Sequence, residues 1–156
     1  MLREYETTFI LQPEITDEGV KSVRERLDGI LERNGAIRLL YDDDGKRRLA
    51  YEIKHFQKGH YLTLHYFDGG KAVPEVERSL RLDESVLRFL TVKVSDTVGD
   101  VEERKKQAAE EEKIRAERAA ERAALDAQEA RDREAEEALR LGPQQDDDSD
   151  ESEDDE

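Results

Sequence analysis

The pattern of hydrophobic and polar positions in the first 96 residues changes between the period of a strand and that of a helix. Residues 3–11 alternate between apolar and polar side chains, which is typical of a strand. Residues 17–33 instead place apolar side chains at helical spacing, with Thr16 as the expected N-cap and Asn34-Gly35 as the end. The apolar positions of this helix are Val20, Val23, Leu27, Ile30 and Leu31.

Strand patterns return at residues 36–41, 47–53 and 60–67, and residues 57–59 are expected to form the turn before the last of these. The interruption at residues 42–45, three aspartates and a glycine, is compatible with a tight hairpin or with a bulge in one long, bent strand. A hairpin would add a fifth strand and break the symmetry of two β-α-β halves, so we favour the bulge.

A short helix carrying Val73, Val76 and Leu80 follows, and residues 86–94 alternate as a last strand. The order of elements is therefore β-α-β-β-α-β, the split β-α-β arrangement. We predict an α+β fold of the ferredoxin-like class, in which two helices lie on one face of a four-stranded antiparallel sheet. A charged extension, partly helical and partly disordered, should follow this domain.

The composition changes near Asp96, and this change predicts the domain organisation. All nine aromatic residues and all three histidines come before it, so the ferredoxin-like domain should occupy residues 1–96. Residues 97–143 are rich in Ala, Glu and Arg with opposite charges at helical spacing but no sustained heptad, which favours a solvated helix over a coiled coil. Residues 144–156 hold nine Asp and Glu and no Lys or Arg, which predicts a disordered acidic tail.

The formal net charge of −15 belongs mainly to the second part of the chain. Residues 1–96 hold 16 Lys and Arg against 18 Asp and Glu, whereas residues 97–156 hold 10 against 23. A nearly neutral domain is able to present a local basic surface to a phosphate backbone. The acidity of the whole chain therefore does not argue against a nucleic-acid partner.

The composition also excludes several classes of protein and site. The chain has no cysteine, which excludes disulfides and thiolate metal sites. The first residues carry charges where a signal peptide needs an apolar stretch, and no apolar run approaches the roughly 20 residues that span a bilayer. We therefore expect a soluble cytoplasmic protein without a membrane partner.

The three histidines do not form a metal-binding pattern. His60 and His65 are five positions apart, an odd number, and should point to opposite faces of a strand, while His55 lies near a turn. No glycine-rich phosphate loop, activated nucleophile or paired carboxylates accompany them. We expect no catalytic residues, metal, cofactor or small-molecule substrate.

The cations Lys46, Arg47 and Arg48 are the most notable candidates for a binding site. Their charge is equally compatible with RNA binding and with protection of a strand edge against aggregation. The following strand matches the first two positions of the RNA-recognition motif at Lys58 and Gly59 but lacks its stacking aromatic residues. Base stacking is therefore not expected on this strand.

Two segments together resemble the bacterial ribosomal protein six family of the small subunit: MLREYET at the start and DDDGKRRLAYEIKHFQKGHYL in the middle. The matching positions are spread over the domain at the intervals of the family pattern, which makes the resemblance specific. They are Arg3, Tyr5, Glu6, Gly45, Lys46, Arg47, Leu49, Ala50, Tyr51, Ile53, Gly59 and Tyr61.

The resemblance implies a ferredoxin-like fold and a structural role in the small ribosomal subunit. It also implies binding to the central domain of small-subunit ribosomal RNA together with ribosomal protein eighteen. The residues that it assigns to RNA or partner contact are first Arg3, Lys46 and Arg47, and then Arg48, Lys54, His55 and Lys58. Tyr5 and Tyr51 are expected to anchor their strands in the core.

An alternative from another class is a ferredoxin-like protein-interaction module that binds no RNA and uses its basic residues only for edge protection. A salt-insensitive complex with one protein, formed without RNA, would favour this alternative. Some members of the family receive additional glutamates at the C-terminus, so the resemblance makes Glu156 a candidate acceptor.

Overall fold

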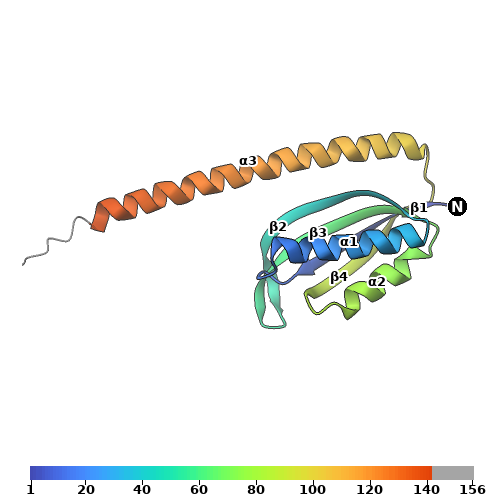
Figure 1. Ribbon diagram of the computed structural model, residues 1–156, viewed down its shortest axis with the longest axis horizontal. Coiled ribbons are helices and arrows are strands. Elements are labelled where there is room, and N and C mark those ends of the chain that lie inside the picture. Colours follow the sequence, from blue (N-terminus) through green and yellow to red (C-terminus); the bar gives the residue numbers. More distant parts are fainter. Residues whose placement is uncertain (142–156) are drawn as a thin grey trace, which may run out of the picture. The chain divides into compact units, whose positions relative to one another are not determined.

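The computed structural model describes residues 1–141, and Met1–Arg115 form one compact unit. The elements are β1 (Arg3–Leu11), α1 (Asp17–Arg33), β2 (Ile37–Ile53), β3 (Phe56–Asp68), α2 (Ala72–Leu82), β4 (Val86–Ser95) and α3 (Val101–Leu141). The four strands form one antiparallel sheet in the order β2-β3-β1-β4, and α1 and α2 lie together on one of its faces (Figure 1). The predicted ferredoxin-like fold with a following charged helix is confirmed.

Helices α1 and α2 begin with different capping groups. The Thr16 hydroxyl accepts a hydrogen bond from the Gly19 N–H at 3.1 Å, as expected for an N-cap. For α2 the buried carboxylate of Asp68 has this role, because it accepts hydrogen bonds from the N–H groups of Ala72 and Val73. All five apolar residues predicted for α1 are buried in the core between the helices and the sheet.

Strand β2 is long and contains the favoured bulge. Its pairing with β3 shifts register between Asp43 and Gly45, where Gly45 has a φ of +72°. The Asp43 carboxylate accepts a hydrogen bond from the Gly45 N–H at 2.9 Å and so fixes the irregular backbone. Residues 37–53 therefore form one bent strand, with no hairpin at the aspartates.

The turn between β2 and β3 differs from the prediction. It lies at Lys54 and His55, which have φ values of 48° and 68°, and β3 begins at Phe56. The predicted turn at residues 57–59 is wrong, because Gly59 is buried inside β3. A Cβ atom at Gly59 would lie 2.3 Å from the Cγ2 atom of Ile10, so glycine serves close packing there.

The first turns of α3 pack within the compact unit, on the face of the sheet that α1 and α2 leave uncovered. Ala108 is fully buried in a small cluster with Leu40 and Phe67. Arg104 pairs with Glu4 at 3.1 Å beside this cluster. The predicted domain boundary after residue 96 stays a prediction, and the structure adds that residues as far as 115 belong to the same compact unit.

Residues 116–141 continue α3 as part of a second unit. No helix within the described part of the chain is long and apolar enough to cross a membrane. The predicted acidic tail at 144–156, with Glu156, lies outside the described residues.

Candidate nucleic-acid interface

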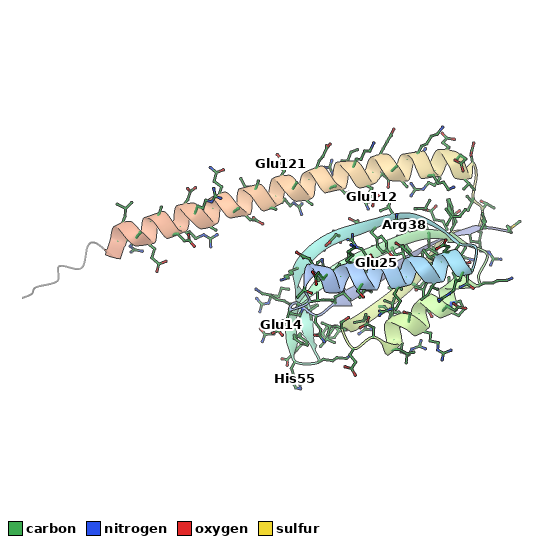
Figure 2. The ribbon with its side chains drawn as sticks, viewed as in Figure 1. Glu14, Glu25, Arg38, His55, Glu112 and Glu121 are labelled. Atoms are coloured by element: carbon green, nitrogen blue, oxygen red, sulfur yellow. The ribbon has the colours of Figure 1, made fainter. Side chains whose placement is uncertain are left out.

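The hairpin formed by β2 and β3 extends past the edge of the four-stranded sheet. Strand β1 pairs with β3 only between His60 and Asp68, so residues 56–59 pair with β2 alone. The turn residue His55 is labelled at the far end of this extension in Figure 2, with its side chain directed away from the sheet. We call residues 45–59 the basic hairpin; its cations are Lys46, Arg47, Arg48, Lys54 and Lys58, and His55 lies at its end.

The register of the basic hairpin sets the face on which each cation lies. Lys46 is opposite His60, Arg47 is opposite Gly59, and Arg48 is opposite Lys58. Neighbours across an antiparallel pair lie on the same face, and successive residues alternate between faces. Lys46, Arg48 and Lys58 therefore share the face that also carries α1 and α2, and Arg47 lies on the other face.

Four of these cations have no carboxylate partner. Lys46, Arg48, Lys54 and Lys58 form no ion pair with any residue in the range 1–141, whereas Arg47 lies 3.4 Å from an Asp44 carboxylate oxygen. Like charges directly opposite one another destabilise a sheet, so the pair of Arg48 and Lys58 is unfavourable without a bound anion. The charges of this surface therefore suit a polyanion such as a nucleic-acid backbone.

Arg3 lies apart from the other predicted site residues. It is opposite Asp68 at the far end of the sheet, and its Nε atom is 3.8 Å from a carboxylate oxygen of Asp96. Along β3 the distance from Asp68 to His60 is about 26 Å at the rise of an extended strand. The structure thus places six of the seven predicted residues along the basic hairpin and leaves Arg3 outside it.

The end of the basic hairpin is held by contacts of its two turn residues. The Lys54 ammonium donates to the Val86 carbonyl at 3.4 Å, which ties the turn to the beginning of β4. The Nδ1 atom of His55 lies 3.3 Å from a Glu52 carboxylate oxygen, although the imidazole is almost fully exposed. A carboxylate therefore accompanies the imidazole at the end of the hairpin.

A polar network at the base of the hairpin keeps the bulge in place. The Asp43 carboxylate contacts the Nε2 atom of His60 at 2.6 Å and the Arg24 guanidinium at 3.3 Å. Burial alone would raise the pKa of Asp43, but the hydrogen bonds from His60 and the Gly45 N–H and the charges of His60 and Arg24 lower it. In the residues described, no three His, Asp or Glu side chains converge as metal ligands.

The sequence did not identify Tyr51 and Arg88 as site residues. The Tyr51 side chain is 57% exposed, so its predicted role as a core anchor is wrong. Tyr51 lies on the face of the sheet opposite α1 and α2 and therefore outside the core between the helices and the sheet. Arg88 of β4 donates a hydrogen bond to the Tyr51 hydroxyl, and its guanidinium lies 6.0 Å from the centre of the ring. Tyr5, in contrast, is half-buried and stacks on Tyr66 as expected for a core residue.

Alternation along β2 is a sequence signal for the face on which Tyr51 lies, but not for its contact with Arg88. Arg47 and Tyr51 are four residues apart and so should share a face of a strand. Nothing in the sequence connects Tyr51 with Arg88, because β2 and β4 are at opposite edges of the sheet and meet only where the hairpin bends.

Comparisons with known proteins match this chain to one family. The family described as "Ribosomal protein S6" matches residues 4–93. The small ribosomal subunit protein bS6 of Trichlorobacter lovleyi is 47% identical over 96 residues, which are 61% of this chain and 78% of that protein. The bS6 protein of Syntrophobacter fumaroxidans is 38% identical over 108 residues, which are 69% of this chain and 74% of that protein.

A solved structure shows the same similarity in three dimensions. The crystal structure of the 30S ribosomal protein S6 from Thermotoga maritima matches this chain with a TM-score of 0.56 at 27% identity. The match covers 70% of this chain and 99% of the Thermotoga chain.

Proposed function

Because this chain belongs to the ribosomal protein S6 family and is a structural protein of the small ribosomal subunit, we propose that its basic hairpin binds small-subunit ribosomal RNA. The RNA segment is the central domain, and binding occurs together with ribosomal protein eighteen of the small subunit. The observation that carries this proposal is Arg48 directly opposite Lys58, with no ion-pair partner for either among residues 1–141.

The chemistry of these side chains fits contacts to a phosphate backbone. Lysine and arginine neutralise phosphates without reading the base sequence, and each contact releases counterions from the RNA. Lys46 lies on the same face as Arg48 and Lys58, so three cations are available to one stretch of backbone. Arg3, at the other end of the sheet, belongs to the proposal as a separate contact.

Exposed aliphatic side chains on β4 support a contact with a protein partner. Leu90, Val92 and Val94 are 65%, 49% and 52% exposed on this edge strand. They support a protein as the second partner, and the family resemblance gives ribosomal protein eighteen as that protein. They also support the alternative of a protein-interaction module without RNA binding, so the experiment must separate the two functions.

The test is a titration of the full chain with a central-domain fragment of small-subunit ribosomal RNA, with and without protein eighteen, over a series of salt concentrations. The double variant Arg48→Gln/Lys58→Gln should bind more weakly. The slope of the logarithm of affinity against the logarithm of salt concentration should become shallower by about one for each phosphate that the two substitutions leave without its cation.

A matched control removes the same charge elsewhere. Lys71→Gln/Arg78→Gln replaces two exposed cations of the α2 region that form no ion pair within residues 1–141. This control should retain the wild-type salt slope. Equal slopes for the wild type and the hairpin variant would instead favour edge protection, and binding to protein eighteen alone would favour the interaction module.

A further inference from the structure

We infer that Tyr51 and Arg88 form a binding site for one unpaired nucleotide of the RNA, with the base on the tyrosine ring and a phosphate on the guanidinium. The inference rests on the proposed binding of RNA by the basic hairpin and adds contacts to the base and to a second strand. Binding at this part of the interface would therefore require that the nucleotide is not base-paired.

The two side chains meet on the face of the sheet opposite α1 and α2. Arg88 is opposite Ile10, and Ile10 is opposite Tyr61, so these three residues share that face. Arg47 lies on the same face with its guanidinium 5.8 Å from the centre of the Tyr61 ring. Two arginine–tyrosine pairs therefore lie on one surface, and the pair of Tyr51 and Arg88 is at its margin.

The bend of the hairpin brings Tyr51 to Arg88 and holds it there. Leu49 is buried above Gly59, with its Cδ2 atom 3.3 Å from the position that a Cβ atom of Gly59 would take. The hydrogen bond from Lys54 to the Val86 carbonyl holds the turn against β4, in which Val86 is two residues before Arg88. The ring of Tyr51 is thus oriented before any ligand arrives, which lowers the entropic cost of binding.

The exposure and charge of the pair fit a nucleotide. More than half of the Tyr51 side chain is accessible, and an aromatic ring held beside a cation is the usual platform for an unpaired base. Arg88 forms no ion pair with any residue in the range 1–141, so its charge is available for a phosphate. Lys54 adds a second cation near Arg88: its ammonium donates to the Val86 carbonyl and forms no ion pair within residues 1–141.

The first test measures binding of the full chain to the central-domain RNA fragment. Tyr51→Leu should weaken binding roughly tenfold with an unchanged salt slope, because the substitution removes the ring and changes no charge. Tyr51→Phe keeps the ring and should bind nearly as the wild type. Arg88→Gln should weaken binding and lower the salt slope by about one.

A second test uses the absence of tryptophan from the chain. Tyr51→Trp introduces a single tryptophan at the site, which is excited selectively at about 295 nm, and stacking of a base should quench its emission when RNA is added. Leu139→Trp is the control, because Leu139 is 84% exposed on α3 and belongs to the second unit, whereas the hairpin belongs to the first. A short oligoadenylate should quench the emission at position 51, and an abasic oligonucleotide of the same length should not.

The outcomes distinguish this inference from the proposed function. If Tyr51→Leu binds RNA as tightly as the wild type and emission at position 51 is unchanged, the nucleotide site is wrong. The RNA function then still stands on the Arg48→Gln/Lys58→Gln result. If Tyr51→Leu weakens only the binding of protein eighteen, the surface is a protein contact and the inference is overturned.

Discussion

At the scale of single residues, Gly59 shows how closely the sheet packs beneath the hairpin. A methyl group at this position would overlap the Ile10 side chain, so Gly59→Ala should lower the free energy of unfolding by about 1–3 kcal/mol. Gly29→Ala is the matched control, because no atom lies within 4 Å of its added Cβ. Alanine is favoured inside a helix, so this control should raise the free energy of unfolding by about 0.5–1 kcal/mol.

Urea denaturation of both variants measures the two effects. If Gly59→Ala unfolds at the same urea concentration as the wild type, β3 does not pass closely under Ile10. If Gly29→Ala raises the free energy of unfolding and Gly59→Ala leaves it unchanged, the effect of helix propensity is confirmed and the packing argument is rejected.

His65 should make the stability of the folded unit depend on pH. Burial lowers its pKa below the usual value, against an opposing effect of Glu6, whose carboxylate lies 4.0 Å from Nδ1. The other charged groups that act on this imidazole are Arg115, Asp42 and Glu4. The unfolded chain therefore gains a proton at His65 before the folded chain does, as pH falls through about 6.5.

The free energy of unfolding should consequently decrease as pH falls from about 7.5 towards 5. Denaturation curves at a series of pH values measure this decrease. His65→Gln removes the titrating group and should give a flatter dependence in this range. An equally steep dependence in His65→Gln would assign the effect to other groups.

At the scale of elements, the contact of α3 with the sheet depends on one small side chain. Ala108 is buried against Leu40 and Phe67, whereas Ala109 is exposed. Ala108→Asp should release the first turns of α3, because an unpaired carboxylate is not retained in an apolar cluster. Ala109→Asp changes charge and helix propensity equally and should leave the packing intact.

Limited tryptic digestion measures how accessible the chain is at Lys105 and Lys106 in the two variants. Cleavage there should be faster in Ala108→Asp than in the wild type, and unchanged in Ala109→Asp. Equal cleavage of the two variants would mean that the helix is held by its ion pairs, such as Arg104 with Glu4, and not by the buried alanine.

The elements that the sequence predicted well have local signals. Alternation identified β1 and β4, and the Thr16 cap and apolar spacing identified α1. The turn at Lys54 and His55 could not be found in this way, because Lys-His is not one of the Asn-Gly, Asp-Gly or Gly-Gly pairs that signal a two-residue hairpin.

The parts of the candidate site that the sequence did not predict have a related explanation. Tyr51 and Arg88 meet only because the hairpin extends beyond the sheet and bends towards β4. This bend depends on contacts among β2, β3 and β4, so the sequence pattern of one strand does not predict it. The packing of Ala108 also gives no signal, because alanine is common throughout the charged helix.

At the scale of the whole molecule, charge is distributed very unevenly. Residues 116–156 hold five Lys and Arg against 17 Asp and Glu, a net charge of −12, whereas residues 1–115 have a net charge of −3. The acidic part should repel RNA at long range when salt is low. A chain ending at Arg115 should therefore bind the central-domain RNA several-fold more tightly than the full chain at low ionic strength.

This difference should shrink as salt is added, because the Debye length falls to about 10 Å at 0.1 M ionic strength. Parallel titrations of the two chains over a salt series provide the measurement. Equal affinities at every salt concentration would show that the acidic part has no electrostatic influence on RNA binding.

The turn at Lys54 and His55 has a consequence for local opening of the chain. Two residues with side chains hold positive φ there, each at a cost of about 1–2 kcal/mol, and the neighbouring strands pair without support from β1. Amide hydrogens of residues 50–57 should thus exchange with deuterium sooner than those of the central strands. Bound RNA should slow that exchange, so the amides of the hairpin would report directly on its occupancy during assembly of the subunit.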